Sequence, residues 1–252
     1  MAKLTTLLFD VDGTLADTER DGHRPAFNQA FTDKGLEWQW SEALYGELLA
    51  VTGGKERIRH YLTLHHPEAL RDAHIDQLIV ELHQTKTRHY TEMLAQGQIP
   101  LRTGVQRLLE EALSADMDMA VVTTTTEANV TALLTHTLGA SSLSWFKLIA
   151  AGDIVPKKKP ASDIYDYTLD KLGVSAAQCL AFEDSENGIK SSLGADIKTL
   201  ITINDYTKDH DFTGAALVVD CLGEPGEDMN VISGQCPCAY VDLACARLLH
   251  AA

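Results

Sequence analysis

The sequence predicts an α/β protein in which a doubly wound, mostly parallel sheet carries an inserted all-helical cap domain. Short apolar runs end abruptly at polar residues, helical patterns lie between those runs, and a long helical stretch without a convincing strand follows the first run. A chain of 252 residues is long enough for one large domain with a smaller insert.

Four apolar runs are predicted to be buried strands. The first, TTLLF at 5–9, is continuous and ends at Asp10, as a strand covered on both faces does. The later runs are MAVVT at 119–123, CLAF at 179–182 and KTLITI at 198–203. Apolar residues three and four positions apart predict intervening helices at 105–113, 128–138 and 164–172. Strand and helix therefore alternate, as in a doubly wound sheet.

The stretch from 17 to 97 is predicted to be entirely helical, with helices at 26–34, 41–50 and 72–94. Ser41 suits the start of the second helix. A helical block directly after the first strand lies over the carboxyl edge of the sheet, where open α/β folds bind ligands. We expect a catalytic core of residues 1–16 and 98–252 and a specificity-determining cap of residues 17–97. The alternative is that these helices belong to one larger core.

Composition excludes several classes of partner. With 36 acidic and 21 basic side chains the formal charge is −15, which repels nucleic-acid backbones and anionic membranes. The apolar run near the amino terminus is too short for a signal-peptide core or a membrane span. We therefore expect a cytoplasmic monomer whose partner is a small molecule.

Five cysteines are present, an odd number that does not form a disulfide framework, so reduced thiols are expected. The Cys236-Pro237-Cys238 sequence with Cys245 is a possible metal site, although neither a second CxxC nor a paired histidine accompanies it.

The first chemical motif is Asp10-Val11-Asp12-Gly13-Thr14, at the end of the first strand. Side chains two apart on a strand share a face, so both carboxylates are expected to converge beyond the sheet edge. Two carboxylates can hold a hard cation, and one can attack phosphorus while the other handles protons. The alternative is a solvated acidic turn.

A second acidic pair, Glu183-Asp184-Ser185, closes the strand at 179–182. Four acids at one sheet edge repel each other unless a divalent cation lies among them. The same residues also suit the start of a helix at 185–193, through the N-cap preference for Asp and Ser. The two roles are compatible.

Two further runs offer groups that bind phosphate. Thr123 to Thr126 place hydroxyls before a helix N-terminus, which favours an anion, although such runs are also ordinary connections. Lys157 to Lys159 precede Pro160, which suits the first turn of the next helix. We expect one lysine to face a phosphoryl group and the other two to be solvated.

These four elements, in this order, resemble the haloacid dehalogenase superfamily of phosphatases and mutases. The helical insert after the first motif looks like the subgroup that includes β-phosphoglucomutase and phosphoglycolate phosphatase. Within that subgroup the stretches DTERDGHRPAFNQAF, YGELLAVTGGKERIRHY and DFTGAALVVDCLGEPG, and the segment 153–165, look most like the CbbY branch. That branch implies a phosphatase of xylulose-1,5-bisphosphate, an inhibitor of Rubisco in the Calvin cycle.

The resemblance implies the catalytic roles. Asp10 would be the nucleophile that becomes an aspartyl phosphate, and Asp12 would protonate the leaving sugar oxygen and then deprotonate water. Thr123 and Lys159 would hold the phosphoryl oxygens. Mg²⁺ would be the cofactor, with ligands from the Asp10 carboxylate, the Asp12 backbone carbonyl, Glu183 and Asp184. Such chemistry relies on positioning and charge neutralisation.

The expected substrate-binding residues surround this centre. Gly53-Gly54-Lys55-Glu56-Arg57 departs from the mutase pattern, and Lys55 with Arg57 could clamp a second phosphate. Thr124, Thr125 and Thr126 follow the phosphate-holding threonine. Glu19 and His23 lie close enough after the first motif to meet sugar hydroxyls, or they are structural. A phosphoglycolate phosphatase, a phosphosugar mutase and an inactive binding subunit are the alternatives.

Overall fold

The computed structural model describes residues 2–236 and 238–252, and in this part of the chain seven strands form one sheet. The strand order is β3-β2-β1-β4-β5-β6-β7, and all neighbouring pairs are parallel except β6 with β7. The strands are β1 Thr6–Phe9, β2 Asp118–Val122, β3 Leu148–Ala150, β4 Cys179–Glu183, β5 Lys198–Thr202, β6 Leu217–Val219 and β7 Val231–Gly234.

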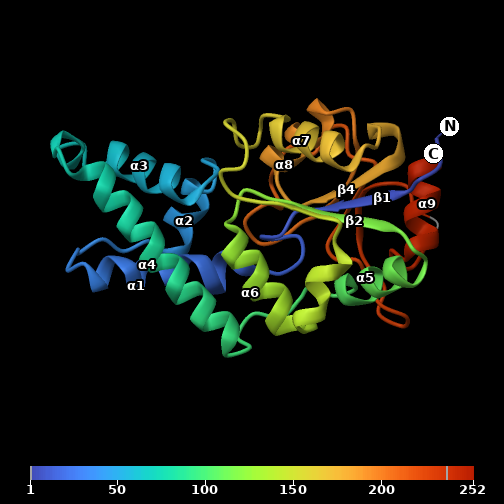
Figure 1. The fold of residues 1–252 in the computed structure, drawn as a ribbon, viewed down its shortest axis with the longest axis horizontal. Helices are drawn as coiled ribbons and strands as arrows, with labels where there is room; N and C mark the ends of the chain where they lie inside the picture. The colour runs from blue at the N-terminus through green and yellow to red at the C-terminus, as the bar shows by residue number, and fades with distance from the viewer. Residues whose placement is uncertain (1, 237) are drawn as a thin grey trace.

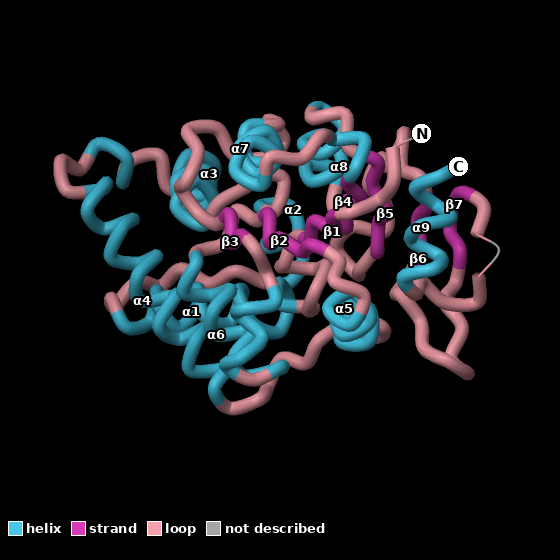
Figure 2. Tube along the Cα trace, turned by 45° about the vertical axis from the view of Figure 1, so that its right-hand side comes forward, coloured by secondary structure: helices cyan, strands magenta, loops and turns pink. Residues whose placement is uncertain are grey.

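Helices cover both faces of the sheet (Figures 1 and 2). Alternate residues of β1 point to opposite faces, so Leu7 packs with α5 (Val105–Ser114), α6 (Glu127–Leu138) and α9 (Leu243–Ala251). Leu8 packs on the other face with α7 (Asp163–Leu172), and α8 (Glu186–Gly194) lies beside α7 there. The doubly wound fold class is therefore confirmed.

The helical stretch between β1 and α5 lies beyond the carboxyl ends of the strands (Figure 1). It has its own core, rich in aromatic side chains such as Phe27, Phe31, Trp40 and Tyr45, all nearly inaccessible to solvent. Its elements are the π-helical turn Glu19–His23, α1 Arg24–Asp33, α2 Glu42–Leu48, α3 Gly54–His65, the 3₁₀ turn Ala69–Arg71 and α4 Ile75–Ala95. We propose that residues 17–97 form the cap.

The two chain segments that join the cap to the sheet run side by side. Ala16 bridges to Leu101, and the Arg102 amide donates to the Leu15 carbonyl at 2.9 Å. The Arg102 guanidinium donates to the backbone carbonyls of four residues from three different connections: Gly13, Thr202, Ile203 and Asp220. Arg102, which the sequence pattern did not single out, therefore fixes the connection beneath the cap.

Several elements were missed because they lack the expected pattern. β3 and β6 are only three residues long, so their apolar runs are short even though β6 is buried, and β7 is exposed throughout. The GGKER segment, interpreted as a glycine-rich approach to an anion, instead begins α3. Pro160 lies before α7 rather than in its first turn, since α7 begins at Asp163. No helix among the described residues is long and apolar enough to cross a membrane.

Candidate active site

The acidic cluster consists of Asp10, Glu183 and Asp184, whose carboxylate oxygens lie within 4.8 Å of one another. All three side chains are buried. Their convergence follows from the sheet, because Phe9 pairs with Phe182, so the residues after each lie side by side at the carboxyl edge. Ser185 takes the separate role of capping α8, where its Oγ accepts from the Gly188 amide at 3.1 Å.

Two glycines allow this close approach. Gly13 has a φ of +87°, and a Cβ there would overlap the Asp184 carboxylate. A Cβ at Gly188, in the first turn of α8, would overlap the Glu183 carboxylate. Both positions are therefore restricted to glycine by the acidic cluster itself.

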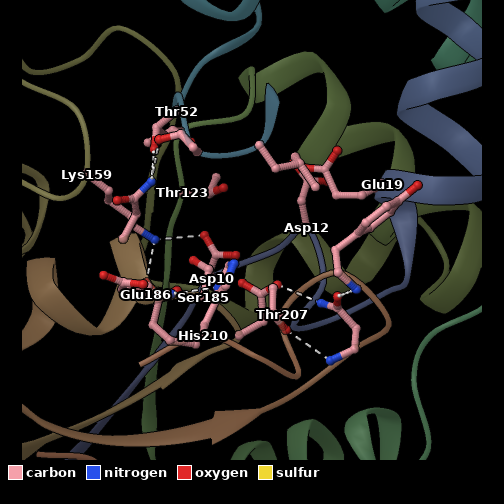
Figure 3. A pocket seen from close by; sticks show the side chains of 18 of the residues that line it. Asp10, Asp12, Glu19, Thr52, Thr123, Lys159, Ser185, Glu186, Thr207 and His210 are labelled. Carbon is pink, nitrogen blue, oxygen red and sulfur yellow. Dashed lines mark hydrogen bonds and ion pairs between the residues drawn. The ribbon is translucent and has the colours of Figure 1, made fainter. Parts of the chain in front are cut away.

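Lys159 pairs with two of the three carboxylates of the acidic cluster. Its Nζ donates to Asp10 Oδ1 at 2.8 Å, to Glu183 Oε1 at 2.5 Å and to the Val122 carbonyl at 2.8 Å (Figure 3). The Tyr165 hydroxyl, which the sequence pattern did not single out, donates to the same Glu183 oxygen at 2.6 Å. Burial opposes the charged form of Lys159, but Asp10 and Glu183 together raise the pKa of its ammonium, so Lys159 stays charged.

One lysine does not balance three carboxylates. Burial raises the pKa of Asp10 to about 7, with Lys159 opposing and Glu183 adding to the increase. Burial, Asp10 and Glu183 together raise the pKa of Asp184 well above its usual range. Glu183 Oε2 is buried and has no hydrogen-bond partner. A cluster of buried oxygen donors with one unpartnered oxygen fits Mg²⁺, a hard cation that prefers oxygen ligands.

Asp12 faces the same cavity but has different side-chain partners from Asp10. Its Oδ1 accepts from Thr18 Oγ1 at 2.6 Å and lies 2.8 Å from His23 Nε2. The expectation that both carboxylates meet at one point is therefore only partly correct, because β1 ends at Phe9 and strand alternation does not extend to Asp12. The carbonyl role expected for Asp12 remains a prediction.

His23 and the buried Lys86 extend this contact into the cap. Lys86 Nζ lies 2.8 Å from His23 Nδ1, and since an ammonium only donates, Nδ1 accepts and Nε2 presents its proton to Asp12. Burial alone would raise the pKa of Asp12, but His23, Thr18 and Lys86 hold it below the usual range. Burial lowers the pKa of Lys86 to about 8, against the opposing effects of Asp12 and Glu19. Sequence reasoning missed Lys86, which lies 63 positions from His23.

Arg57 and Glu19 form a second group of cap residues that line the site. Arg57 Nη1 donates to the Tyr45 hydroxyl at 2.8 Å and lies 3.7 Å from Glu19 Oε2. The Tyr45 hydroxyl in turn donates to Glu19. Arg57 is buried apart from the surface that it presents to the cavity. This arrangement orients one guanidinium and one carboxylate toward the same space.

The Lys55 side chain is directed toward Asp153 rather than toward the space that Arg57 faces. Its Nζ pairs with Asp153 Oδ2 at 2.5 Å, and Lys158 joins the same contact by pairing with Asp153 and Glu56. Lys55 and Arg57 are two positions apart in α3, and such residues lie on different faces of a helix. The structure therefore does not bring them together as a clamp. Lys158 is also not the solvated lysine that was expected, because it bridges the cap and the sheet.

Only part of the threonine run faces the cavity. Thr123 is buried, and its Oγ1 accepts from the Thr125 amide at 3.3 Å. Thr124 lines the cavity, whereas Thr125 Oγ1 accepts from Asn129 Nδ2 at 2.8 Å. Thr126 caps α6 by accepting from the Asn129 amide.

A cavity of about 340 Å³ joins these groups between the cap and the sheet (Figure 3). Nine predicted residues line it: Asp10, Asp12, Glu19, Arg57, Thr123, Thr124, Lys159, Glu183 and Asp184. His23, Lys55 and Thr125 lie outside this cavity, in smaller hollows nearby. The other polar residues that line the main cavity include Thr52, Asn187, Asn204, Tyr206 and His210, none of which belongs to a recognisable motif.

Residues 7–202 match the haloacid dehalogenase-like hydrolase family. The chain belongs to this family. It is similar to CbbY of Cupriavidus necator, at 43% identity over 98% of this chain and 97% of that one. It is also similar to CbbY of Rhodobacter capsulatus, at 45% identity over 84% of this chain and 91% of that one.

A solved structure supports the same placement. A variant of CbbY from Rhodobacter sphaeroides, in complex with xylulose-1,5-bisphosphate, is 38% identical, with a TM-score of 0.78 over 86% of this chain and 94% of that one. The chain is thus a CbbY-like hydrolase with the haloacid dehalogenase-like fold.

Proposed function

We propose that this CbbY-like hydrolase is a Mg²⁺-dependent phosphatase that removes one phosphate from a sugar bisphosphate through an aspartyl phosphate on Asp10. Xylulose-1,5-bisphosphate, the compound held by the similar Rhodobacter sphaeroides protein, is the leading substrate. The observation that carries the proposal is that Asp10, Lys159 and Arg57 face one cavity whose volume suits a small molecule.

Asp10 is the nucleophile in this proposal. Its carboxylate oxygen attacks phosphorus, the ester bond to the sugar oxygen breaks, and the phosphoryl group is then carried by Asp10 until water releases inorganic phosphate. Thr123 and Lys159 hold phosphoryl oxygens during transfer. Mg²⁺, held by Asp10, Glu183, Asp184 and the Asp12 carbonyl, supplies positive charge that keeps these carboxylates ionised and neutralises the phosphoryl group.

Asp12 moves the protons. Its carboxylate, held ionised by His23 and Lys86, is suited to accept a proton from the attacking water in the second step. In the first step Asp12 must donate a proton to the leaving sugar oxygen. The arriving phosphate dianion raises the pKa of the neighbouring carboxyl by like-charge repulsion, and so favours the protonated form.

The cap residues supply specificity. Arg57 presents fixed donors to the cavity, where they can hold the phosphate that is not transferred. Glu19 faces the same space and can accept from sugar hydroxyls. We assign His23 to orienting Asp12, because its two ring nitrogens face Asp12 and Lys86.

The test is a panel of phosphorylated compounds with release of inorganic phosphate as the readout, with Mg²⁺ and with excess chelator. The panel includes xylulose-1,5-bisphosphate, ribulose-1,5-bisphosphate, phosphoglycolate and hexose phosphates. We expect rapid phosphate release from a ketose bisphosphate, abolished by the chelator and restored by Mg²⁺. Isomerised sugar phosphate with little net release would show a mutase, and preference for phosphoglycolate would show the other alternative.

An inactive binding subunit is disfavoured by the intact site. Asp10, Asp12, Thr123 and Lys159 all face one cavity beside a complete acidic cluster. Absence of turnover on every compound in the panel, together with tight binding of one of them, would overturn the enzymatic proposal.

A further inference from the structure

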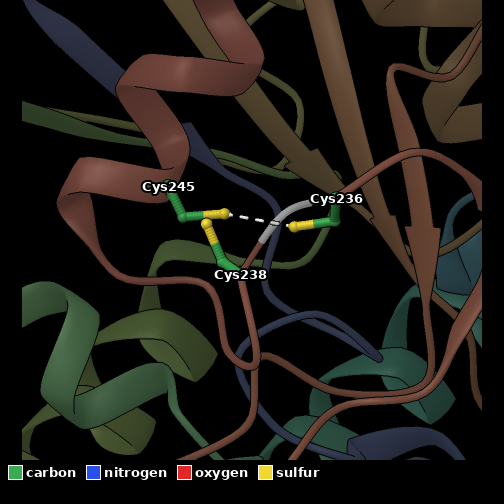
Figure 4. A group of neighbouring side chains, drawn as sticks. All are labelled: Cys236, Cys238 and Cys245. Atoms are coloured by element: carbon green, nitrogen blue, oxygen red, sulfur yellow. Dashed lines mark hydrogen bonds between the residues drawn. The ribbon is translucent and has the colours of Figure 1, made fainter.

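Three cysteines that the proposed activity does not use come together at the opposite end of the sheet. The thiol cluster consists of Cys236, Cys238 and Cys245, whose sulfur atoms lie within 4.8 Å of one another (Figure 4). The Sγ atoms of Cys236 and Cys245 are 3.3 Å apart. Cys245 is buried, and the other two are partly exposed. All three lie beyond residue 202, where the match to the hydrolase family ends.

We propose that the thiol cluster is a binding site for a thiophilic metal ion, with Zn²⁺ as the reference ion. In a tetrahedral zinc site with Zn–S bonds of about 2.3 Å, sulfur atoms lie about 3.8 Å apart. The three sulfurs are therefore close to the required spacing. They supply three thiolate ligands, and the partial exposure of Cys236 and Cys238 leaves the fourth position to water.

Hydrogen bonds hold the backbone at Cys245 and directly after Cys238. Cys245 is the third residue of α9, and its amide donates to the capping Asp242 carboxylate at 2.6 Å. The Leu243 amide donates to Glu111 of α5 at 2.9 Å. The segment that directly follows Cys238 is held by two backbone hydrogen bonds, because the Ala239 carbonyl accepts from the Met229 amide and the Val241 amide donates to the Leu222 carbonyl. Pre-ordered ligands lose little entropy on binding an ion.

Charge and ligand type favour a soft cation. Three thiolates around Zn²⁺ carry a net negative charge, and the N-terminus of α9, where Cys245 lies, offsets part of it. Thiolates select zinc and other soft ions, whereas the oxygen donors of the acidic cluster select Mg²⁺. The two clusters therefore bind different ions. The metal would link the segment after β7 to α9.

The experiment uses Co²⁺ as a spectroscopic probe of the reduced, chelator-treated full chain. We expect a sulfur-to-cobalt charge-transfer band in the near ultraviolet that saturates at one ion per chain and disappears when Zn²⁺ is added. Cobalt bound by the acidic cluster has only oxygen ligands and gives no such band. Elemental analysis after removal of excess Zn²⁺ gives the stoichiometry independently.

The variants Cys236→Ser and Cys238→Ser should each lose the band. Zinc binding should weaken more than about 100-fold, because removing a direct ligand costs more than removing a residue that only orients one. Cys221→Ser is the matched control, a partly exposed thiol outside the cluster that should leave the band intact. Circular dichroism checks that the variants fold. The titration of the wild-type chain tests the proposal even if a variant does not fold. No saturable band in the wild type, a band unchanged in both cluster variants, or a Cys236–Cys245 disulfide that Zn²⁺ does not prevent would overturn the proposal.

Discussion

The acidic cluster and the thiol cluster place three ligating side chains within the same distance, yet they arise in different ways. Asp10, Glu183 and Asp184 lie at the carboxyl ends of neighbouring parallel strands, and the pairing of β1 with β4 brings them together. The thiols come from a loop after the antiparallel β7 and from the first turn of α9. A parallel sheet aligns strand ends in a way that a sequence reveals, whereas a loop and a helix meet only through tertiary packing.

The difference also concerns charge. Burial, and to a lesser extent repulsion between the carboxylates, raises the pKa of Asp10 and Asp184, so the acidic cluster requires compensation by cations. Neutral thiols can remain close without such compensation. Losing an acidic ligand should therefore affect catalysis strongly, and losing a thiol should affect metal content alone.

Asp10→Asn should reduce phosphate release by about 10⁴-fold or more, because an amide oxygen does not replace the nucleophile. The measurement is kcat under saturating Mg²⁺, with circular dichroism as the control for folding. Retention of more than a small fraction of wild-type turnover would place the nucleophile elsewhere.

Glu183→Gln should weaken activation by Mg²⁺ by about 10- to 100-fold, since an amide has no charge to attract the cation and disturbs the contacts with Lys159 and Tyr165. The Mg²⁺ dependence of the rate gives this value. Cys238→Ser, the counterpart in the thiol cluster, should leave that dependence unchanged, and an equal effect of both would break the contrast.

Lys86→Met should lower kcat/KM by about 10- to 100-fold. The reason is that Lys86 helps to orient Asp12 through His23, and its loss should remove part of the rate acceleration that acid–base catalysis supplies. The pKa of Lys86 is about 8, so its charge is present below that pH and is lost as pH rises through it. Wild-type activity should therefore decline above about pH 8. Lys86→Arg, which stays charged, should move this decline to higher pH, and an unchanged profile in both variants would exclude a role for Lys86 in orienting Asp12 through His23.

Arg57→Ala should raise the KM for a bisphosphate by about tenfold relative to a monophosphate, a difference of about 1.4 kcal/mol. Lys55→Ala is the matched control from the same helix and should change this ratio less than about threefold, because Lys55 is paired with Asp153. A larger effect of Lys55 would show that the substrate draws it away from Asp153 and that it reads the distal phosphate.

Replacing all three cluster cysteines by serine should change kcat with Mg²⁺ by less than about twofold. The thermal midpoint should lose its dependence on added Zn²⁺, because an ion stabilises only the state that binds it. Melting curves with and without Zn²⁺ check this expectation. A kcat loss as large as that of Glu183→Gln would connect the two clusters functionally.

The alternation of strands and helices, the helical stretch after β1, and the polar residues at the carboxyl ends of β1, β2 and β4 could all be predicted from the amino-acid sequence. Apolar runs and helical spacing report burial directly, and strand ends in a parallel sheet share one edge. Asp10, Thr123, Glu183 and Asp184 therefore lie at neighbouring strand ends, as their spacing after apolar runs indicates.

Which side chains from distant segments meet depends on tertiary packing. Lys86 approaches His23 across 63 positions, and Arg102 reaches carbonyls more than 100 positions away, with no local pattern that signals either contact. Helix geometry separated Lys55 from Arg57, although they are two residues apart. The meeting of Cys236 and Cys238 with Cys245 likewise depends on how α9 packs against α5, because hydrophobic packing specifies partners by shape and position rather than by sequence spacing.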